Sequence, residues 1–238
     1  MTTNIMAVIA AMAEVATAAP PVEGSLSKPR QPVITLSRDY GSGGDVIATR
    51  LSQRLGVPLY DEQLLQEIAR RLDDDPAIVQ MLDESMGRAK DMWLYRLLSG
   101  KDINHDTYRD TLVKVVMSLG RLGGVIIGRG AHVILAEGCA LRVRITGSPE
   151  VCARRMADAG HGTFEDLLKR AQDLNHRRGK FVWDTFHARL SDASGFDVTI
   201  NTDRMADFED VVEMLVGLAT AIHSGRVLSL NKGYSNAP

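Results

Sequence analysis

Five short apolar runs recur along the chain, and segments with helical spacing separate them. The runs begin at Val33, Val57, Val125, Leu141 and Phe196. Their lengths and their β-branched residues are typical of buried strands. Strands that alternate with helices favour parallel pairing through right-handed crossovers. The pattern therefore predicts an α/β fold with a doubly wound, mainly parallel, five-stranded sheet.

Apolar residues at intervals of three and four predict the helices between and after these runs. The predicted helices cover residues 47–55, 62–72, 112–119, 149–155, 164–178 and 208–222. Residues 73–114 are mostly polar and helix-prone, with no clear strand, and this indicates a helical insertion over the sheet.

The ends of the chain set the expected domain boundaries. We expect a flexible leader at residues 1–32, one α/β domain at 33–225 and a loose tail at 226–238. The apolar run near the N-terminus follows no Lys or Arg and contains Glu14, which argues against a signal peptide and favours the cytoplasm. No run reaches the roughly 18 to 20 apolar residues of a spanning helix, so we expect no membrane association.

Composition narrows the classes of partner. A chain of 238 residues with a net charge of −2 has no overall basic footprint, which argues against extensive binding to a nucleic acid polymer. Cys139 and Cys152 are too few for a disulfide framework and lack metal-ligand spacing. The six histidines show no metal-ligand spacing either, so packing or surface roles are expected for them. A small anionic ligand needs only a local basic patch.

The run VITLSRDYGSGGDVIATRL, residues 33–51, carries the clearest chemical signal. A strand enters a glycine-rich turn and then an amphipathic helix, which is how a phosphate-binding loop is built. Gly41, Gly43 and Gly44 permit positive φ and a close approach of phosphate to the backbone, and the helix dipole favours an anion there. An ordinary strand-to-helix turn is the alternative interpretation.

The full P-loop signature, G-x-x-x-x-G-K-[ST], is not present. With Gly43 at its second glycine, Arg38 stands at the first, Gly44 replaces the lysine and Asp45 replaces the serine or threonine. Residues 38–45, Asp61 and Arg129 nevertheless follow separate strands at the carboxyl edge of the sheet, where ligands of such folds bind.

The order of motifs resembles the cytidylate kinase-like family of P-loop proteins. The resemblance is carried by ITLSRDYGSGG, LGVPLYDEQLL, VIIGRGAHVILAEGCALRVRITGSPEVCARRM, QDLNHRRGKFVW and FDVTINTD. Gly130 stands where cytidylate kinases carry an aspartate. The resemblance implies a P-loop NTPase-type fold, with residues 73–114 binding the acceptor and residues 160–190 forming a lid-like region.

The resemblance also implies transfer of the γ-phosphoryl group of ATP to a nucleoside monophosphate, with CMP or dCMP as the leading acceptor and Mg²⁺ as the metal. Such transfer depends on positioning and on neutralising phosphoryl charge. The donor phosphates would be held by the loop, and Arg38 would supply part of the charge of the missing lysine. The residues of the loop are Arg38, Asp39, Tyr40, Gly41, Ser42, Gly43, Gly44 and Asp45.

The remaining site residues each have two interpretations. Asp45, with Ser42 as the weaker candidate, would bind Mg²⁺, or Asp45 would simply meet the helix dipole. Asp61 and Arg129 would bind the acceptor, or Arg129 would form a structural ion pair with an acid such as Asp61.

Two arginine pairs are also ambiguous. Arg154 and Arg177 are the catalytic candidates, together with Arg38 and Arg129. Arg154 is followed by Arg155, and Arg177 is followed by Arg178. Adjacent residues cannot share a helical face, so at most one arginine of each pair is expected in the cleft.

Two further functions stay open from the sequence. One is a regulatory protein that binds a nucleotide or another anion without transferring phosphate, as the loss of the lysine and of the hydroxyl residue suggests. The other is a kinase that acts on another small phosphorylated metabolite. The sequence leaves the oligomeric state open.

Overall fold

The computed structural model describes residues 5–17, 29–73, 107–136, 138 and 140–226. They form a three-layer α/β fold around one five-stranded sheet, as the sequence predicts. The strands are β1 (Val33–Arg38), β2 (Leu59–Tyr60), β3 (Gly124–Ile127), β4 (Ala140–Thr146) and β5 (Val198–Asn201). All neighbouring pairs are parallel, in the order β2-β3-β1-β4-β5.

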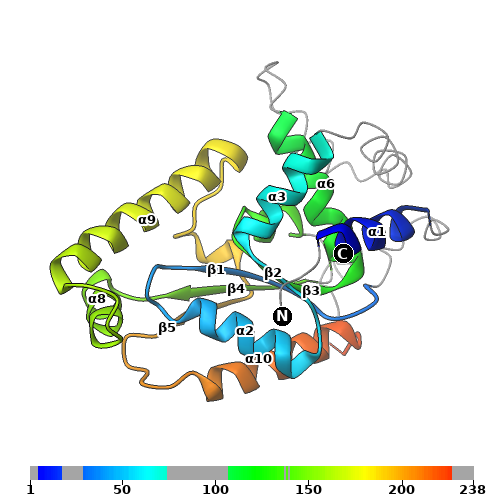
Figure 1. Ribbon diagram of the computed structural model, residues 1–238. Helices are drawn as coiled ribbons and strands as arrows, with labels where there is room; N and C mark the ends of the chain where they lie inside the picture. The colour runs from blue at the N-terminus through cyan, green and yellow to red at the C-terminus, as the bar shows by residue number, and fades with distance from the viewer. Residues whose placement is uncertain (1–4, 18–28, 74–106, 137, 139, 227–238) are drawn as a thin grey trace, which may run out of the picture.

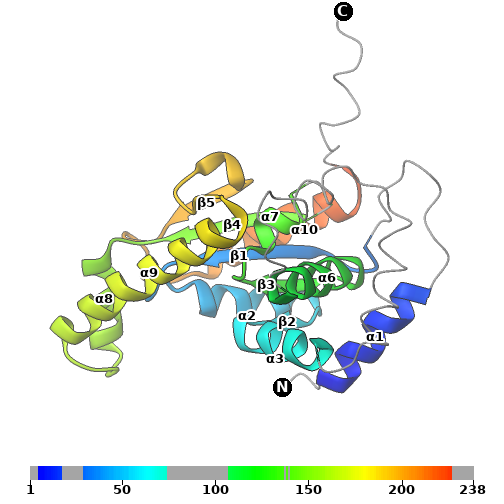
Figure 2. The ribbon, with the colours of Figure 1, turned by 90° about the horizontal axis from the view of Figure 1, so that it is seen from above.

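Two helical layers cover the sheet (Figure 1). Below it in that view lie α2 (Gly44–Leu55) and α10 (Glu209–His223). The other side carries α3 (Glu62–Asp73), α6 (Thr107–Leu122) and α9 (Phe164–Phe186). The short α7 (Ala131–Ile134) packs in the same core cluster as α3 and α6. Helix α8 (Pro149–Asp158) pairs with the first part of α9 beyond the end of the sheet, as Figure 2 also shows.

Successive side chains along each strand point to opposite faces of the sheet, so the hydrophobic core has one part on each face. Ile34 and Leu36 of β1 pack with α2 and α10, and the neighbouring strands contribute Val125 and Val143 to the same cluster. The opposite face of the sheet is apolar at β3, where Ile126 packs with α3 and α6. Because apolar side chains fill one face and part of the other, the sheet is fixed in register and its carboxyl edge presents the loops in fixed positions.

The expectation of a flexible leader over all of residues 1–32 is wrong for residues 5–17. These residues form α1 (Ile5–Thr17), which lies against α6 and α3 and buries Val8, Ile9 and Met12. Burial of an apolar face stabilises this helix, and a neighbour distant in sequence supplies the partner surface. Residues 18–28 lie outside the described residues.

Where the structure describes the other predicted segments, their observed ends differ from the predicted ends. Helix α9 continues beyond the predicted end near residue 178 to Phe186. It is a single helix of 23 residues, and Thr163 is its N-cap. Most of the predicted insertion, residues 74–106, lies outside the described residues, and its last part is the first half of α6. Most of the predicted tail, residues 227–238, also lies outside them. No helix within the described segments is long and apolar enough to cross a membrane.

Two residues with reactive side chains are committed to packing. His132 is buried on α7, where its ring stacks on Phe196 with centroids 4.5 Å apart and Nδ1 lies 3.3 Å from the Ser37 hydroxyl. Burial, assisted by the charge of Arg144, lowers the pKa of His132 to about 4. Burial also raises the pKa of the Cys152 thiol to about 11. These values keep the imidazole neutral and the thiol protonated at neutral pH, as packing residues require.

Candidate active site

The glycine-rich turn after β1 has the backbone of a phosphate-binding loop. Gly41 and Gly43 have φ values of 72° and 82°, in the region that favours glycine. Gly43 is the N-cap of α2, so the first amides of this helix have no acceptor within it and point toward the carboxyl edge of the sheet. Together with the helix dipole they form a site that favours an anion.

Packing against the loop also requires these glycines. A Cβ atom on Gly41 would lie 2.8 Å from the carbonyl oxygen of Cys152, and one on Gly43 would lie 2.2 Å from the Phe208 ring. A Cβ atom on Gly44 would lie 2.4 Å from the Cβ of Arg38. The neighbours therefore approach the loop as closely as glycine allows.

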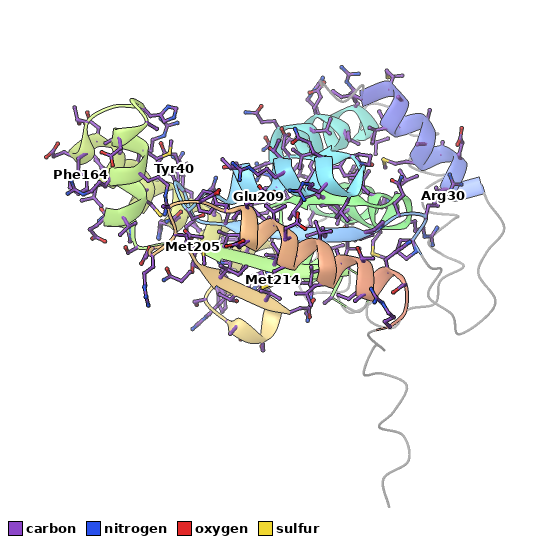
Figure 3. All side chains as sticks on the ribbon, turned by 90° about the horizontal axis from the view of Figure 1, so that it is seen from below. Arg30, Tyr40, Phe164, Met205, Glu209 and Met214 are labelled. Carbon is purple, nitrogen blue, oxygen red and sulfur yellow. The ribbon has the colours of Figure 1, made fainter. Side chains whose placement is uncertain are left out.

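Arg155 fixes the far side of the loop, and this role was not predicted from the sequence. Its Nη1 donates to the Gly41 carbonyl oxygen at 2.8 Å, and its Nη2 donates to the carbonyl oxygens of Thr202 at 2.8 Å and Met205 at 3.3 Å. Its guanidinium also stacks over Phe208. Figure 3 labels Tyr40 and Met205 at this end of the molecule, where α8 meets the sheet. Arg155 thus joins the loops after β1 and β5.

Arg154, predicted to be catalytic, does not face the loop. It is exposed, and its guanidinium lies 5.0 Å from the centre of the Phe164 ring at the start of α9. Helical geometry turns adjacent residues of α8 in different directions, so Arg155 faces the loop and Arg154 faces away from it.

Ser42, the weaker metal candidate, is also turned inward. Its side chain is buried, and its hydroxyl donates to the carbonyl oxygen of Asp39 at 2.9 Å. Its own carbonyl oxygen accepts from the Thr202 hydroxyl at 2.8 Å. Because these bonds hold the turn closed, Ser42 stabilises the loop and does not present an oxygen to a metal ion.

Arg38 extends across the carboxyl edge of the sheet from the end of β1. Its Nε lies 2.9 Å from Asp45 Oδ1, and its Nη1 lies 3.6 Å from Glu62 Oε2. The Arg38 side chain is only 9% exposed, whereas that of Asp45 is 68% exposed. A buried cation beside the first turn of α2 occupies the place where phosphate charge would need neutralising.

Arg129 faces the same region from the turn after β3. Its Nη2 lies 2.9 Å from Glu62 Oε1, and its guanidinium lies 4.8 Å from the centre of the Phe181 ring. The backbone of Arg129 has φ 51°, a sparsely populated conformation for a residue with a side chain. Its Nε is buried and has no hydrogen-bond partner among the described residues. The next residue, Gly130, has φ 71°, and a Cβ there would lie 2.2 Å from Phe186, so no aspartate fits in that backbone and packing.

The acid that joins these arginines is Glu62, whereas the sequence pointed to Asp61. Asp61 is exposed and caps α3, because its Oδ1 accepts a hydrogen bond from the Leu64 amide at 2.8 Å. This is the ordinary role of aspartate before a helix. The structural ion pair that was one alternative for Arg129 is therefore formed with Glu62, not with Asp61, and Glu62 also pairs with Arg38.

A third arginine reaches the site from α9. Arg178 Nη1 donates to the carbonyl oxygen of Arg38 at 3.2 Å. Burial lowers the pKa of Arg178, and the charge of Arg38 adds to this effect. Arg177, the predicted catalytic member of this pair, is exposed, and together with Arg38, Arg129 and Arg178 it lines one cavity. The structure therefore places both members at the site but buries Arg178 more deeply.

These residues enclose a cavity of about 280 Å³ under α9. Its charged lining consists of Arg38, Arg129, Arg177, Arg178 and Glu62. Four arginines and one glutamate give this lining a net positive charge, and the low solvent exposure of Arg38 and Arg129 strengthens their field. The geometry suits an anion with several oxygens, since guanidinium groups bind phosphate in a bidentate manner.

The remaining loop residues are tied to their neighbours. The Tyr40 amide donates to Asn175 Oδ1 of α9 at 2.8 Å, and the Arg170 guanidinium lies over the Tyr40 ring. Asp39 Oδ1 accepts from Arg144 Nη2 at 2.6 Å. Helix α9 is therefore bonded directly to the phosphate loop.

An all-parallel sheet in this order, with a glycine-rich loop after its central strand, defines a P-loop-type α/β protein. The chain belongs to the cytidylate kinase-like family, whose model matches residues 33–204. Membership in this family supports nucleotide-dependent phosphoryl transfer as the general class of chemistry.

Two solved structures are similar to this chain at low sequence identity, and the first shares its fold. An uncharacterized protein from Eubacterium ventriosum is 17% identical, with a TM-score of 0.59 over 80% of this chain and 99% of the other. Shikimate kinase from Bacteroides thetaiotaomicron is 16% identical, with a TM-score of 0.44 over 80% of this chain and 99% of the other. No curated protein matches the chain.

Proposed function

We propose that this protein transfers the γ-phosphoryl group of ATP to a nucleoside monophosphate, with CMP or dCMP as the acceptor. The observation that carries the proposal is the meeting of Arg38, Arg129 and Arg178 beside the first turn of α2. Transfer of a phosphoryl group requires charge neutralisation and positioning more than covalent chemistry from the protein. Three buried or half-buried guanidinium groups next to a helix N-terminus supply both.

Each residue then has a specific role in this proposal. The amides at the start of α2 bind the donor phosphates, and Arg38 supplies the charge that a loop lysine would otherwise supply. Arg129 and Arg178 bind the acceptor phosphate. Glu62 holds Arg38 and Arg129 in place, because it contacts both guanidinium groups.

A magnesium ion fits this set of residues at Asp45. Magnesium is commonly bound through one or two carboxylates together with substrate phosphates. Asp45 stands exposed in the first turn of α2, and its Oδ2 has no hydrogen-bond partner among the described residues. No group of three or more His, Cys, Asp or Glu side chains able to hold a metal occurs in the described part of the chain. Asp45 would therefore bind the metal together with the nucleotide, and the metal would neutralise phosphate charge.

The test is release of ADP from ATP and Mg²⁺ with a panel of nucleoside monophosphates. We expect turnover that depends on CMP or dCMP, at least 100-fold lower in Arg38→Ala and Arg129→Ala. Arg154→Ala is the matched control, because Arg154 is exposed and turned away from the loop. Unchanged turnover in Arg38→Ala and Arg129→Ala would remove the proposed roles.

The second candidate function is nucleotide or anion sensing without transfer. The observation that favours it is that Arg38 is already paired with Asp45 and Glu62, in a loop that lacks the usual lysine. This function predicts an increase in melting temperature with nucleotide and no ADP release for any acceptor in the panel.

A further inference from the structure

A second cavity lies on the other flank of α9, toward β4 and β5. Its volume is about 830 Å³, within the range of small-molecule sites. Its wall includes Asp39, Arg144, Asn175, Lys180, Trp183 and Arg189. None of these six residues lines the arginine-rich cavity described above. The two cavities share Leu190 and both border α9, but they have no charged residue in common.

The wall of this second cavity combines an exposed aromatic ring with a cation. Trp183 is 45% exposed, although a tryptophan is usually mostly buried. The guanidinium of Arg189 lies 5.0 Å from the centre of the Trp183 ring, and the His187 ring meets its edge. A planar ligand ring can stack on an indole that is exposed in this way, beside the positive charge.

The charges of the wall favour a negatively charged ligand. Arg144 is paired with Asp39 at 2.6 Å, and Lys180 is paired with Asp184 at 2.6 Å. Arg189 takes part in no ion pair among the described residues, so one positive charge of the wall is not compensated. The Arg144 side chain is more than nine-tenths buried, and its Nε has no hydrogen-bond partner in the described part of the chain.

From these features we infer that the second cavity binds a planar heteroaromatic ring that carries a negative charge, the chemistry of a nucleoside phosphate. The ring stacks on Trp183, and the anionic group pairs with Arg189. The site borders the phosphate loop, because the Tyr40 amide donates to Asn175 and Asp39 belongs to the loop itself. It is distinct from the cavity proposed for phosphoryl transfer.

Trp183 provides the signal for the test. The chain contains two tryptophans, so Trp93→Phe leaves Trp183 as the only one. This variant is titrated without Mg²⁺ with CMP, ATP, uncharged cytidine, and ribose 5-phosphate, which has no ring. We expect saturable quenching by the two nucleotides and at least tenfold weaker binding of cytidine and ribose 5-phosphate. Calorimetry of the wild-type protein gives a second measurement. For a nucleotide that quenches Trp183 we expect two binding sites, one in the second cavity and one at the site proposed for phosphoryl transfer.

Three arginine variants locate the ligand. Arg189→Ala is expected to weaken the quenching at least tenfold, whereas Arg154→Ala, which removes another arginine stacked on an aromatic ring, leaves it unchanged. Arg129→Ala alters the other cavity and also leaves it unchanged. Quenching lost in Arg129→Ala and kept in Arg189→Ala would place the ligand in the other cavity and overturn the inference. The absence of saturable quenching, together with a single calorimetric site, would also overturn it. If the wild-type protein releases no ADP with any acceptor but still shows saturable quenching, the proposed kinase function alone is rejected.

Discussion

Gly43 allows a separate test of the packing that shapes the phosphate loop. Alanine at this position must adopt φ near 82°, which costs about 1 to 2 kcal/mol for a residue with a Cβ. Its Cβ would also lie 2.2 Å from Phe208, so the ring must move. Overpacking of this kind costs about 1 to 3 kcal/mol. The expected loss for Gly43→Ala is therefore about 2 to 5 kcal/mol.

Gly56 is the matched control at the other end of α2. It has φ 63°, and a Cβ there would meet no heavy atom within 4 Å. Gly56→Ala thus retains the backbone strain without the steric overlap, and should cost only about 1 to 2 kcal/mol. In a domain of this size about 1 kcal/mol corresponds to roughly 2 to 4 °C in melting temperature. Thermal unfolding should place the Gly43 variant about 2 to 12 °C below the Gly56 variant.

A smaller residue at position 208 completes the test. Phe208→Leu removes the ring that the new Cβ would meet, so Gly43→Ala should be at least about 1 kcal/mol less costly in that background. Two glycine variants that melt within 1 °C of each other, or a cost that does not change in the Phe208→Leu background, would refute the argument from packing.

Three further predictions concern single side chains. Arg155→Met should lower stability to chemical denaturation by about 2 to 4 kcal/mol, since three carbonyl oxygens lose a charged donor, while Arg154→Met changes it by less than about 0.5 kcal/mol. Glu62→Gln should bind inorganic phosphate about fivefold more tightly in calorimetry, because the guanidinium groups lose a competing carboxylate; unchanged or weaker binding would contradict this. His132 has a folded pKa of about 4 against an ordinary 6.5, so the unfolded state binds the proton first and stability falls by about 3 kcal/mol as the pH drops from 6.5 to 4. Urea unfolding across that range should show a shallower decline in His132→Asn, and parallel pH profiles would contradict the assignment.

The fold could be predicted because its signals are local. Strand β1, the glycine turn and α2 follow one another within 23 residues, and each has its own pattern of apolar positions or glycines. Helix α1 could not be predicted in the same way. Its apolar residues are buried by α6, which begins about 90 residues later, and no local pattern reports that contact.

The positions of the site residues could likewise be predicted where the signal is local and not where distant contacts decide. The position of Arg38 and Arg129 at the carboxyl edge could be predicted because the end of a parallel strand fixes where the next residue lies. The choices between Arg154 and Arg155, and between Arg177 and Arg178, depend on how α8 and α9 are rotated against the sheet, which tertiary packing decides. For Asp61 a local signal did exist, because aspartate just before a helix is a common N-cap. If Asp61 is assigned as the N-cap, the neighbouring Glu62 is the acid that can pair with the arginines of the site.

The structure also explains how a phosphate loop can exist here without its usual lysine and hydroxyl residue. Contacts from outside determine the backbone of the loop, with Arg155 bonded to Gly41 and Phe208 packed on Gly43. Positive charge comes instead from arginines on three separate segments, at the end of β1, after β3 and on α9. Different residues therefore determine the shape of the loop and the positive charge beside it, so a loop with Gly44 in place of the lysine still has both. Variants that alter the shape should therefore lower stability, whereas removal of Arg38 or Arg129 should act mainly on phosphate binding and transfer.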